Sequence, residues 1–163
     1  MFSLEIITLA RLLVDEARER SLRIVTAESC TGGLVAAAIC HVAGASDVFE
    51  RGFVTYSNRA KQELLGVPGD LIADLGAVSE PVARMMAEGA LNNSNAHLAL
   101  AVTGVAGPGG GTPLKPVGTV HLATARANQG VAHRHELFDL EDRVGIQLAA
   151  VRLALEMLRE RID

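Results

Sequence analysis

Aromatic residues are scarce in this sequence, which contains no tryptophan, 1 tyrosine and 4 phenylalanines. Proteins that bind single-stranded nucleic acids usually stack the bases on exposed aromatic side chains. An excess of positive charge is also absent, because 15 lysines and arginines stand against 19 aspartates and glutamates, for a net charge of −4. A protein that grips the phosphate backbone needs a basic surface. We therefore expect no direct contact with nucleic acid, and a small molecule as the partner.

Cysteines and long apolar runs are few as well. Cys30 and Cys40 are the only cysteines, and no CxxC pair accompanies them. We therefore expect no disulfide framework, no zinc cage made of thiols, and two reduced side chains. The longest uninterrupted apolar run, residues 34–40, is far shorter than the roughly 18 residues of a membrane span, and no basic segment typical of a secretory signal opens the chain. These features favour a cytoplasmic protein without membrane contact.

What the sequence does contain is enough apolar material for one folded domain. It has 163 residues, 49% of them hydrophobic, within the usual domain size of about 100 to 200 residues, so we treat residues 1–163 as a single domain. The expected helices are 4–20, 31–41, 58–65, 79–90 and 142–161, and the expected strands are 22–27, 53–56, 97–103, 118–125 and 131–138. Helices that alternate with strands and a late hairpin predict a three-layer α/β/α sandwich with a mixed β-sheet.

Ser29 lies where the first expected strand meets the following helix. The N–H groups of Cys30, Thr31 and Gly32 are expected to point toward whatever binds at this helix N-terminus. A nucleophile and an oxyanion hole would then share one turn. The alternative is that Ser29 or Thr31 only caps the helix and the glycines permit a tight turn. Cys30 is a rival nucleophile, but we expect it to behave as a small buried apolar residue.

A serine nucleophile needs a base, and no histidine stands in a GxSxG context that would suggest a Ser-His-Asp triad. Lys61 is expected on the first turn of a helix, where burial and the helix dipole disfavour its charged form. It would then accept the serine proton. Tyr56, five residues earlier, is the partner that would relay the proton or orient Lys61. The alternative is that Lys61 is a solvated charge and Tyr56 packs its ring.

A glycine-rich loop follows the third expected strand, over residues 103–112. Its backbone N–H groups suit an anion, although it fits neither GxxxxGK[ST] nor GxGxxG. Gln147 and Arg143 lie one turn apart at the start of the last expected helix, and both are candidates to contact a ligand. The ligand-binding candidates in and around this loop are Thr103, Gly107, Gly109, Gly110, Lys115 and Arg143. The alternative is a flexible connection with solvated charges.

Three histidines are expected on one face of the hairpin. His133 and His135 alternate along a strand, and His121 lies across from them. Without carboxylates at a recognisable spacing, we interpret these histidines as surface or packed side chains and expect no metal site.

Taken together, several motifs in one order resemble the C-terminal domain of the CinA family. The resemblance covers roughly residues 4–160 and rests on the segments TAESCTGG at 26–33, GFVTYSN at 52–58, LLGV at 64–67, GAVS at 76–79, TGVAGPGG at 103–110 and KPVGTV at 115–120. That domain also occurs alone as a nicotinamide mononucleotide deamidase of the PncC type, an amidohydrolase of the pyridine nucleotide cycle in NAD metabolism.

The resemblance implies hydrolysis of nicotinamide mononucleotide to nicotinic acid mononucleotide and ammonia, without metal or cofactor. Ser29 would be the nucleophile, Lys61 the base, and Tyr56 the residue that shuttles or orients the proton. Many family members carry a second, N-terminal domain associated with nucleotide pyrophosphatase activity, and we expect no such activity from these 163 residues. Two alternatives stay open: a non-enzymatic nucleotide-binding partner in competence or the DNA-damage response, and an amidase for another carboxamide. The apolar helices also make a homo-oligomer plausible.

Overall fold

The sheet is mixed, as expected from the sequence. The structure, a computed structural model, describes residues 1–163, and its five strands lie in the order β2-β1-β3-β4-β5. Strand β1 (Ile24–Glu28) pairs in parallel with β2 (Phe49–Val54) and β3 (Leu98–Gly104). Strands β4 (Thr119–Arg126) and β5 (Gly130–Leu137) continue the sheet in antiparallel fashion.

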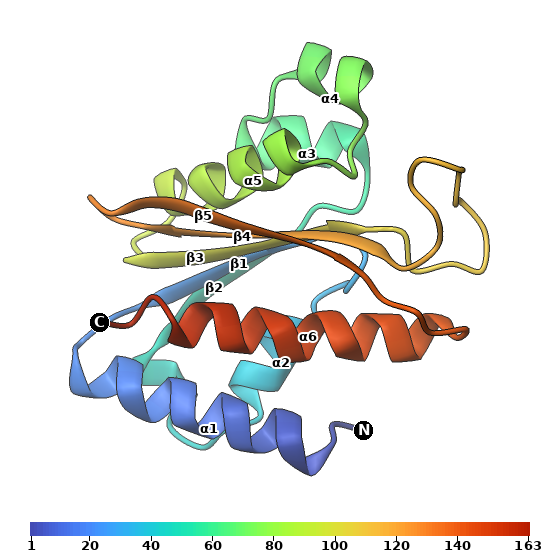
Figure 1. The fold of residues 1–163 in the computed structure, drawn as a ribbon. Helices are drawn as coiled ribbons and strands as arrows, with labels where there is room; N and C mark the ends of the chain where they lie inside the picture. The colour runs from blue at the N-terminus through green and yellow to red at the C-terminus, as the bar shows by residue number, and fades with distance from the viewer.

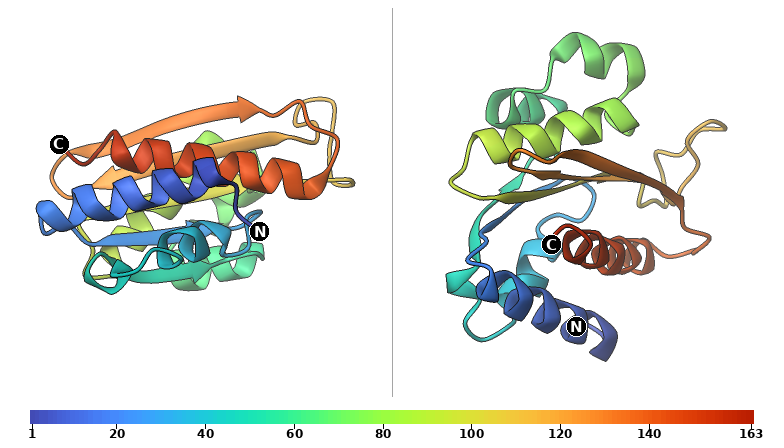
Figure 2. Two further views of the ribbon diagram at one scale, coloured as in Figure 1. Left: turned by 90° about the horizontal axis from the view of Figure 1, so that it is seen from below. Right: turned by 60° about the vertical axis from the view of Figure 1, so that its left-hand side comes forward.

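Helices cover both faces of this sheet, which confirms the three-layer α/β/α sandwich (Figure 1). One layer consists of α1 (Leu4–Glu19), α2 (Leu34–Cys40) and α6 (Arg143–Arg159). The other consists of α3 (Asn58–Leu65), α4 (Gly69–Leu75) and α5 (Glu80–Asn92), and the right-hand view of Figure 2 separates the two layers clearly. None of these helices has the length and apolar character needed to cross a bilayer.

The central strands are buried on both faces, and this divides the core into two clusters. Side chains of successive strand residues point to opposite faces. Large side chains such as Leu98 and Leu100 therefore face α6, whereas Ala99 and Ala101 face α5. The small residues on the second face allow α5 to pack close to the sheet.

Two elements differ from the sequence-based expectation. Strand β2 runs over Phe49–Val54 rather than 53–56, because it is a partly exposed edge strand whose polar residues hide the apolar pattern. Helix α2 begins at Leu34 rather than at residue 31. Gly32 and Gly33 have φ angles of 56° and 99°, in the left-handed region, so the chain makes a turn before the helix starts.

Smaller elements were missed or misplaced. The sequence pattern predicts neither helix α4 nor the 3₁₀ turn over Ala45–Asp47. The cap of α3 is Ser57, whose Oγ accepts the Ala60 N–H, rather than Asn58, which is the first helical residue. Gly66 ends α3 in the left-handed conformation, as expected.

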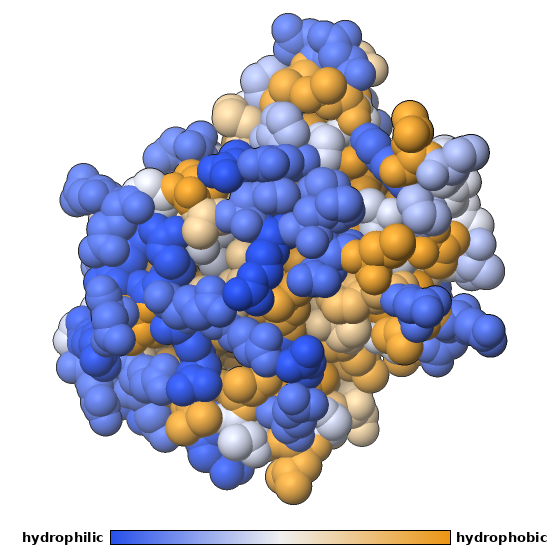
Figure 3. Space-filling model, viewed as in Figure 1, coloured by the Kyte–Doolittle hydropathy of each residue, from blue (hydrophilic) through white to orange (hydrophobic).

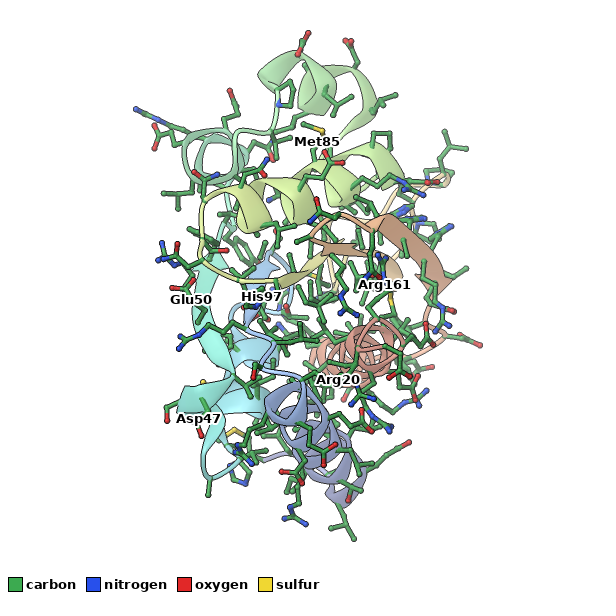
Figure 4. All side chains as sticks on the ribbon, turned by 90° about the vertical axis from the view of Figure 1, so that its left-hand side faces the viewer. Arg20, Asp47, Glu50, Met85, His97 and Arg161 are labelled. Carbon is green, nitrogen blue, oxygen red and sulfur yellow. The ribbon has the colours of Figure 1, made fainter.

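Parallel strands bring their carboxyl ends to one edge of the sheet, where ligands bind in open α/β folds. The segments that follow β1, β2 and β3 meet at this edge, and the N-terminus of α6 reaches it from below (Figure 1). Figure 4 looks at the opposite end of the sheet, where Arg161 lies against the hairpin turn and donates to the Gln129 and Gly130 carbonyls at 3.0 and 2.9 Å. These contacts join the residues that follow α6 to the hairpin turn, and the candidate site lies at the other end of the sheet.

Candidate active site

Ser29 and Lys61 form a buried pair at the carboxyl edge of the sheet. Ser29 directly follows β1, and Lys61 lies on α3. Lys61 Nζ lies within hydrogen-bonding distance of Ser29 Oγ, at 3.0 Å, and donates to the Thr55 carbonyl at 2.8 Å and to the Tyr56 carbonyl at 3.3 Å. Ser29 is 8% exposed and Lys61 only 1% exposed. The alternative of a solvated lysine is therefore wrong.

The surroundings of Lys61 favour an uncharged amine. None of the ion pairs of the chain involves Lys61, and burial lowers the pKa of its amine below the ordinary range of a lysine. A neutral amine has two N–H donors and one lone pair. With the Thr55 and Tyr56 carbonyls as acceptors for the donors, the lone pair is left for the Ser29 hydroxyl.

The turn after Ser29 is organised around a buried carboxylate. Glu28, fully buried, accepts the Thr31 hydroxyl at 2.6 Å, the Val35 N–H at 2.8 Å and the Ala36 N–H at 3.0 Å. The first turn of α2 is therefore capped from within the protein. Neither Ser29 nor Thr31 caps this helix with its side chain, so that part of the alternative is wrong, whereas Gly32 and Gly33 do permit the tight turn.

Two of the three N–H groups expected to form an oxyanion hole are available. The Gly32 N–H donates to the Ser29 carbonyl at 3.0 Å, so this expectation was wrong for Gly32. The N–H groups of Cys30 and Thr31 have no acceptor on another residue. The Cys30 thiol is buried, and burial raises its pKa to about 12, so it is a poor nucleophile, in agreement with its expected role as a small apolar residue.

Arg143, at the first position of α6, connects two walls of the site. Its guanidinium donates to the Gly107 carbonyl at 2.5 Å and to the Tyr56 hydroxyl at 2.7 Å. Tyr56 is 59% exposed, and its ring does not pack in the core. Gln147 on the same helix donates to the Cys30 carbonyl at 2.9 Å, which ties α6 to the Ser29 turn.

These side chains enclose a cavity of about 190 Å³. Its lining residues are Ser29, Cys30, Tyr56, Asn58, Lys61, Ala77, Val78, Thr103, Gly104, Ala106 and Arg143. Thr103 contributes from the end of β3 and donates its hydroxyl to the Ala77 carbonyl at 2.9 Å, which holds one wall in place. The cavity therefore combines a hydroxyl, a buried amine and one guanidinium, and its lining includes Cys30, whose N–H group has no acceptor on another residue.

Comparison with known proteins places this fold and site in a family. The family model of the CinA C-terminal domain matches residues 6–162. The chain belongs to the CinA family. A CinA-like protein of Akkermansia muciniphila is 58% identical over 118 residues, which are 72% of this chain and 28% of that protein. A putative competence-damage inducible protein of Caldicellulosiruptor bescii is 45% identical over 154 residues, 94% of this chain and 37% of that protein.

The CinA-family chain thus spans about a third of the length of the curated relatives it matches. Solved CinA structures match it over nearly their whole length. The competence/damage inducible protein CihA from Agrobacterium tumefaciens superposes with a TM-score of 0.97 at 49% identity, covering 98% of this chain and 97% of that one. A CinA superfamily protein from Klebsiella pneumoniae has a TM-score of 0.91 at 35% identity, covering 96% and 97%.

Several residues predicted for ligand binding in this CinA domain lie outside the cavity lining. Lys115 Nζ donates a hydrogen bond to the Leu75 carbonyl at 2.6 Å. Its positive charge therefore lies at the C-terminal end of α4, where the helix dipole favours a cation. Gly109 and Gly110 are exposed in the β3–β4 loop, and Gly107 reaches the site only through its carbonyl on Arg143. The loop therefore positions Arg143, and its contribution of N–H groups to an anion stays a prediction.

Five lining residues are absent from the sequence-based site candidates, and two of them, Gly104 and Ala106, belong to the glycine-rich segment 103–112. The sequence predicts only a helix-capping role for Asn58, whereas its exposed side chain lines the site. Ala77 and Val78 form another wall, and their signal was the GAVS motif before α5, which carried no assigned role. Small apolar residues give no local indication that they line a cavity, since the same residue types fill cores.

Tyr56 also differs in its contacts from the expected proton relay. The Tyr56 hydroxyl accepts a hydrogen bond from Arg143, and the Tyr56 backbone carbonyl accepts one from Lys61. The tyrosine therefore orients Lys61 through its main chain and Arg143 through its side chain. A direct hydroxyl-to-amine contact is absent from this arrangement.

A larger cavity of about 630 Å³ lies beside the β3–β4 loop, and its lining offers no hydroxyl or amine. On the hairpin, His121 Nδ1 lies 2.9 Å from His133 Nε2, and the His135 ring stacks on His121 with centroids 4.4 Å apart. No group of three or more histidine, cysteine, aspartate or glutamate side chains is arranged to share a metal ion. The Ser29–Lys61 cavity is therefore the candidate active site of this CinA domain.

Proposed function

We propose that this domain hydrolyses the carboxamide of nicotinamide mononucleotide to nicotinic acid mononucleotide and ammonia, as a step of the pyridine nucleotide cycle. The observation that carries the chemistry is the contact of 3.0 Å between Ser29 Oγ and the buried, ion-pair-free Lys61 Nζ. The choice of substrate follows from the resemblance of the motifs around Ser29, Tyr56 and Lys61 to the deamidases of the family. Another small carboxamide is the alternative substrate.

Acylation begins when neutral Lys61 takes the Ser29 hydroxyl proton and Oγ attacks the carboxamide carbon. The negative charge that develops on the carboxamide oxygen is accepted by the free N–H groups of Cys30 and Thr31. The C–N bond then breaks. Lys61 returns its proton to the leaving nitrogen, and ammonia departs from an acyl-Ser29 ester.

Deacylation repeats these steps with water. Lys61 removes a proton from the water molecule, and the resulting oxygen attacks the ester carbon. The bond to Ser29 Oγ breaks, Oγ regains the proton from Lys61, and the carboxylic acid is released. Every proton transfer uses groups of this chain, so the steps require neither a metal ion nor a cofactor.

The cavity volume suggests how a nucleotide would be placed. About 190 Å³ is below the roughly 300 to 1,000 Å³ of pockets that hold whole drug-sized ligands. The aromatic carboxamide would enter the cavity, and the ribose phosphate would remain at its mouth. There, the exposed guanidinium of Arg143 supplies the cation that suits a phosphate. In this arrangement, the Tyr56 hydroxyl holds Arg143 in place.

The test is production of ammonia and nicotinic acid mononucleotide from nicotinamide mononucleotide, with chelator present, by the intact protein and by Ser29→Ala. Turnover that survives the chelator and is lost in the variant supports the serine mechanism. Full turnover by Ser29→Ala would contradict it. No turnover by the intact folded protein across several carboxamides would contradict the amidohydrolase function itself.

An exposed apolar surface favours a second candidate function, binding of a protein partner or of another copy of the chain. Figure 3 shows hydrophobic side chains gathered on the side that carries the β3–β4 loop. Leu114 is 93% exposed, and Leu137 and Val144 are 57% and 59% exposed. Capture of a competence or DNA-damage partner that is unaffected by Ser29→Ala, from a protein without turnover, would favour this role. Sedimentation of the purified chain tests the homo-oligomer.

A further inference from the structure

Glu28 is a fully buried carboxylate to which the mechanism above gives no role. It ends β1 and directly precedes Ser29. No basic side chain pairs with it; instead, its oxygens accept the Thr31 hydroxyl and the N–H groups of Val35 and Ala36. A buried charge is costly unless hydrogen bonds satisfy it, and the N-terminus of a helix is a favourable place for an anion. The position that a ligand anion takes in many strand-turn-helix sites is occupied here by the protein itself.

The contacts of Glu28 tie both ends of the turn that carries Ser29. Thr31, inside the turn, and the first N–H groups of α2, just after it, bind the same carboxylate. The Ser29 N–H is held by the Val102 carbonyl at 2.9 Å, and its carbonyl by the Gly32 N–H at 3.0 Å. Within the turn, the main chain adds only the Gly32 bond and a bond of 3.0 Å from the Leu34 N–H to the Thr31 carbonyl, so the Glu28 contacts are the side-chain bonds that hold it.

We propose that Glu28 is the positioning residue of Ser29. By holding Thr31 and the start of α2, its carboxylate fixes the turn in the one arrangement that places Ser29 Oγ at Lys61 and leaves the N–H groups of Cys30 and Thr31 free. The catalytic consequence rests on the proposed function, whereas the positioning of the nucleophile does not.

Glu28→Gln is the first test because it keeps the size of the side chain. The amide has one oxygen acceptor in place of two, and its NH₂ group faces either the Ala36 N–H or the Thr31 hydroxyl and the Val35 N–H. We expect kcat for ammonia release to fall about 10- to 100-fold, since misplacement of a nucleophile by about 1 Å costs up to that factor. We expect KM, and the dissociation constant of nicotinic acid mononucleotide, to stay within about threefold, because Arg143 is untouched.

Ser3→Ala is the matched control for loss of a helix cap. Ser3 Oγ accepts the Ile6 N–H at 3.2 Å at the start of α1, which lies in the layer away from the Lys61 helix. This variant should melt at a lower temperature and keep its kcat. Both variants are assayed below their melting transitions and compared per folded molecule, so a general loss of stability would lower the melting temperature without the selective fall in kcat.

A second readout requires no assumption about the substrate. An uncharged aryl sulfonyl fluoride labels an activated serine: the Oγ–S bond forms, the S–F bond breaks, fluoride leaves, and Lys61 takes the hydroxyl proton. Labelling of Ser29, located by peptide mass spectrometry, should be at least about 10-fold slower in Glu28→Gln than in the intact protein. Thr31→Val, which loses only the hydrogen bond of 2.6 Å to Glu28, should slow labelling in the same direction and serves if Glu28→Gln does not fold.

The outcomes separate the two proposals. Labelling and turnover of Glu28→Gln and Thr31→Val at the rates of the intact protein would overturn the positioning role. A loss of ligand affinity in Glu28→Gln as large as the loss in kcat would also overturn it, because the whole cavity would then have changed. If the intact protein releases no ammonia but the labelling difference remains, only the proposed function is contradicted.

Discussion

The acceptors around the Lys61 amine are backbone carbonyls, and no acidic side chain forms an ion pair with it. Burial of an ammonium group costs several kcal/mol unless it is paired, and proteins relieve this cost by releasing the proton. The carbonyls of Thr55 and Tyr56 accept hydrogen bonds from either protonation state, so they hold the side chain without fixing its charge. Such a lysine contributes little net stability, and its chemistry depends on the distance to Ser29.

Lys61→Met tests this balance between stability and activity. Removal of the amine should lower ammonia release by at least about 100-fold, because the general base is lost. The free energy of unfolding should change by less than about 2 kcal/mol, since relief of the buried amine offsets the two unpaired carbonyls. Ammonia assays and urea unfolding measure the two effects. A collapse of stability together with activity would show that Lys61 is mainly structural.

Arg143→Ala tests the placement of the phosphate. We expect KM for nicotinamide mononucleotide to rise much more than kcat falls, because the guanidinium would bind the substrate and the transition state alike. Tyr56→Phe is the companion variant, since it removes only the hydroxyl that contacts Arg143 at 2.7 Å. It should raise KM in the same direction by a smaller factor. Equal losses in kcat and KM for Arg143→Ala would indicate a catalytic or structural role instead.

Helix α3 carries Lys61, and its position depends on a close contact with α5. At Gly89 of α5, an added Cβ would lie 1.9 Å from the Leu65 carbonyl oxygen and 2.8 Å from its carbon. The backbones of the two helices therefore meet directly at this point. Because Leu65 is one turn beyond Lys61, any separation of the helices moves the amine relative to Ser29, which sits on a different element.

Gly89→Ala should therefore act on both stability and activity. In an exposed helix this change stabilises by up to about 1 kcal/mol, but here the clash should destabilise by roughly 1 to 3 kcal/mol and lower kcat. Glu88→Ala, on the exposed side of the same helix, is the control and should leave both unchanged. Thermal melting and ammonia release provide the measurements. A more stable Gly89→Ala protein would show that α3 adjusts without cost.

At the level of the whole molecule, the histidines of the hairpin join β4 and β5 to α5 next to the site. His133 lies 3.6 Å from Glu80 at the start of α5, and His121 pairs in the sheet with Thr103 of the cavity. Burial, together with the nearby His135 and His133, lowers the pKa of His121 from 6.5 to about 4. The folded protein therefore resists protonation at a position where the unfolded chain accepts a proton.

This difference predicts a loss of stability in acid. Between about pH 6.5 and about pH 4 the unfolded state binds a proton at His121 that the folded state does not, so the free energy of unfolding falls as the pH decreases through this interval. His121→Asn should flatten the decrease. His41→Asn, at an exposed position outside the cluster, should leave it unchanged. Urea unfolding at a series of pH values is the measurement, and equal slopes for both variants would contradict the prediction.

The sequence by itself determined the features that depend on neighbouring residues. Apolar periodicity indicated the main helices and strands, and glycines marked the ends of the Ser29 turn and of α3. The sequence pattern also placed Ser29 at the end of the first strand and Lys61 on the helix that became α3. These inferences succeed because helix periodicity, caps and turns are decided within a few residues. The bounds of edge strand β2 were predicted wrongly, and the short α4 was not predicted, because their local patterns are weak.

Only the tertiary structure decided which side chains meet. Ser29 and Lys61 are 32 residues apart, and Tyr56 and Arg143 are 87 apart, so their contacts follow from the strand order and from how α6 returns to the sheet. The same packing brought the Lys115 amine of the β3–β4 loop to the last carbonyl of α4 rather than into the cavity. Burial, which shifts the pKa of Lys61, is likewise a property of the assembled layers. A sequence lists groups capable of chemistry, and the fold sets the distances and the local dielectric that make a few of them reactive.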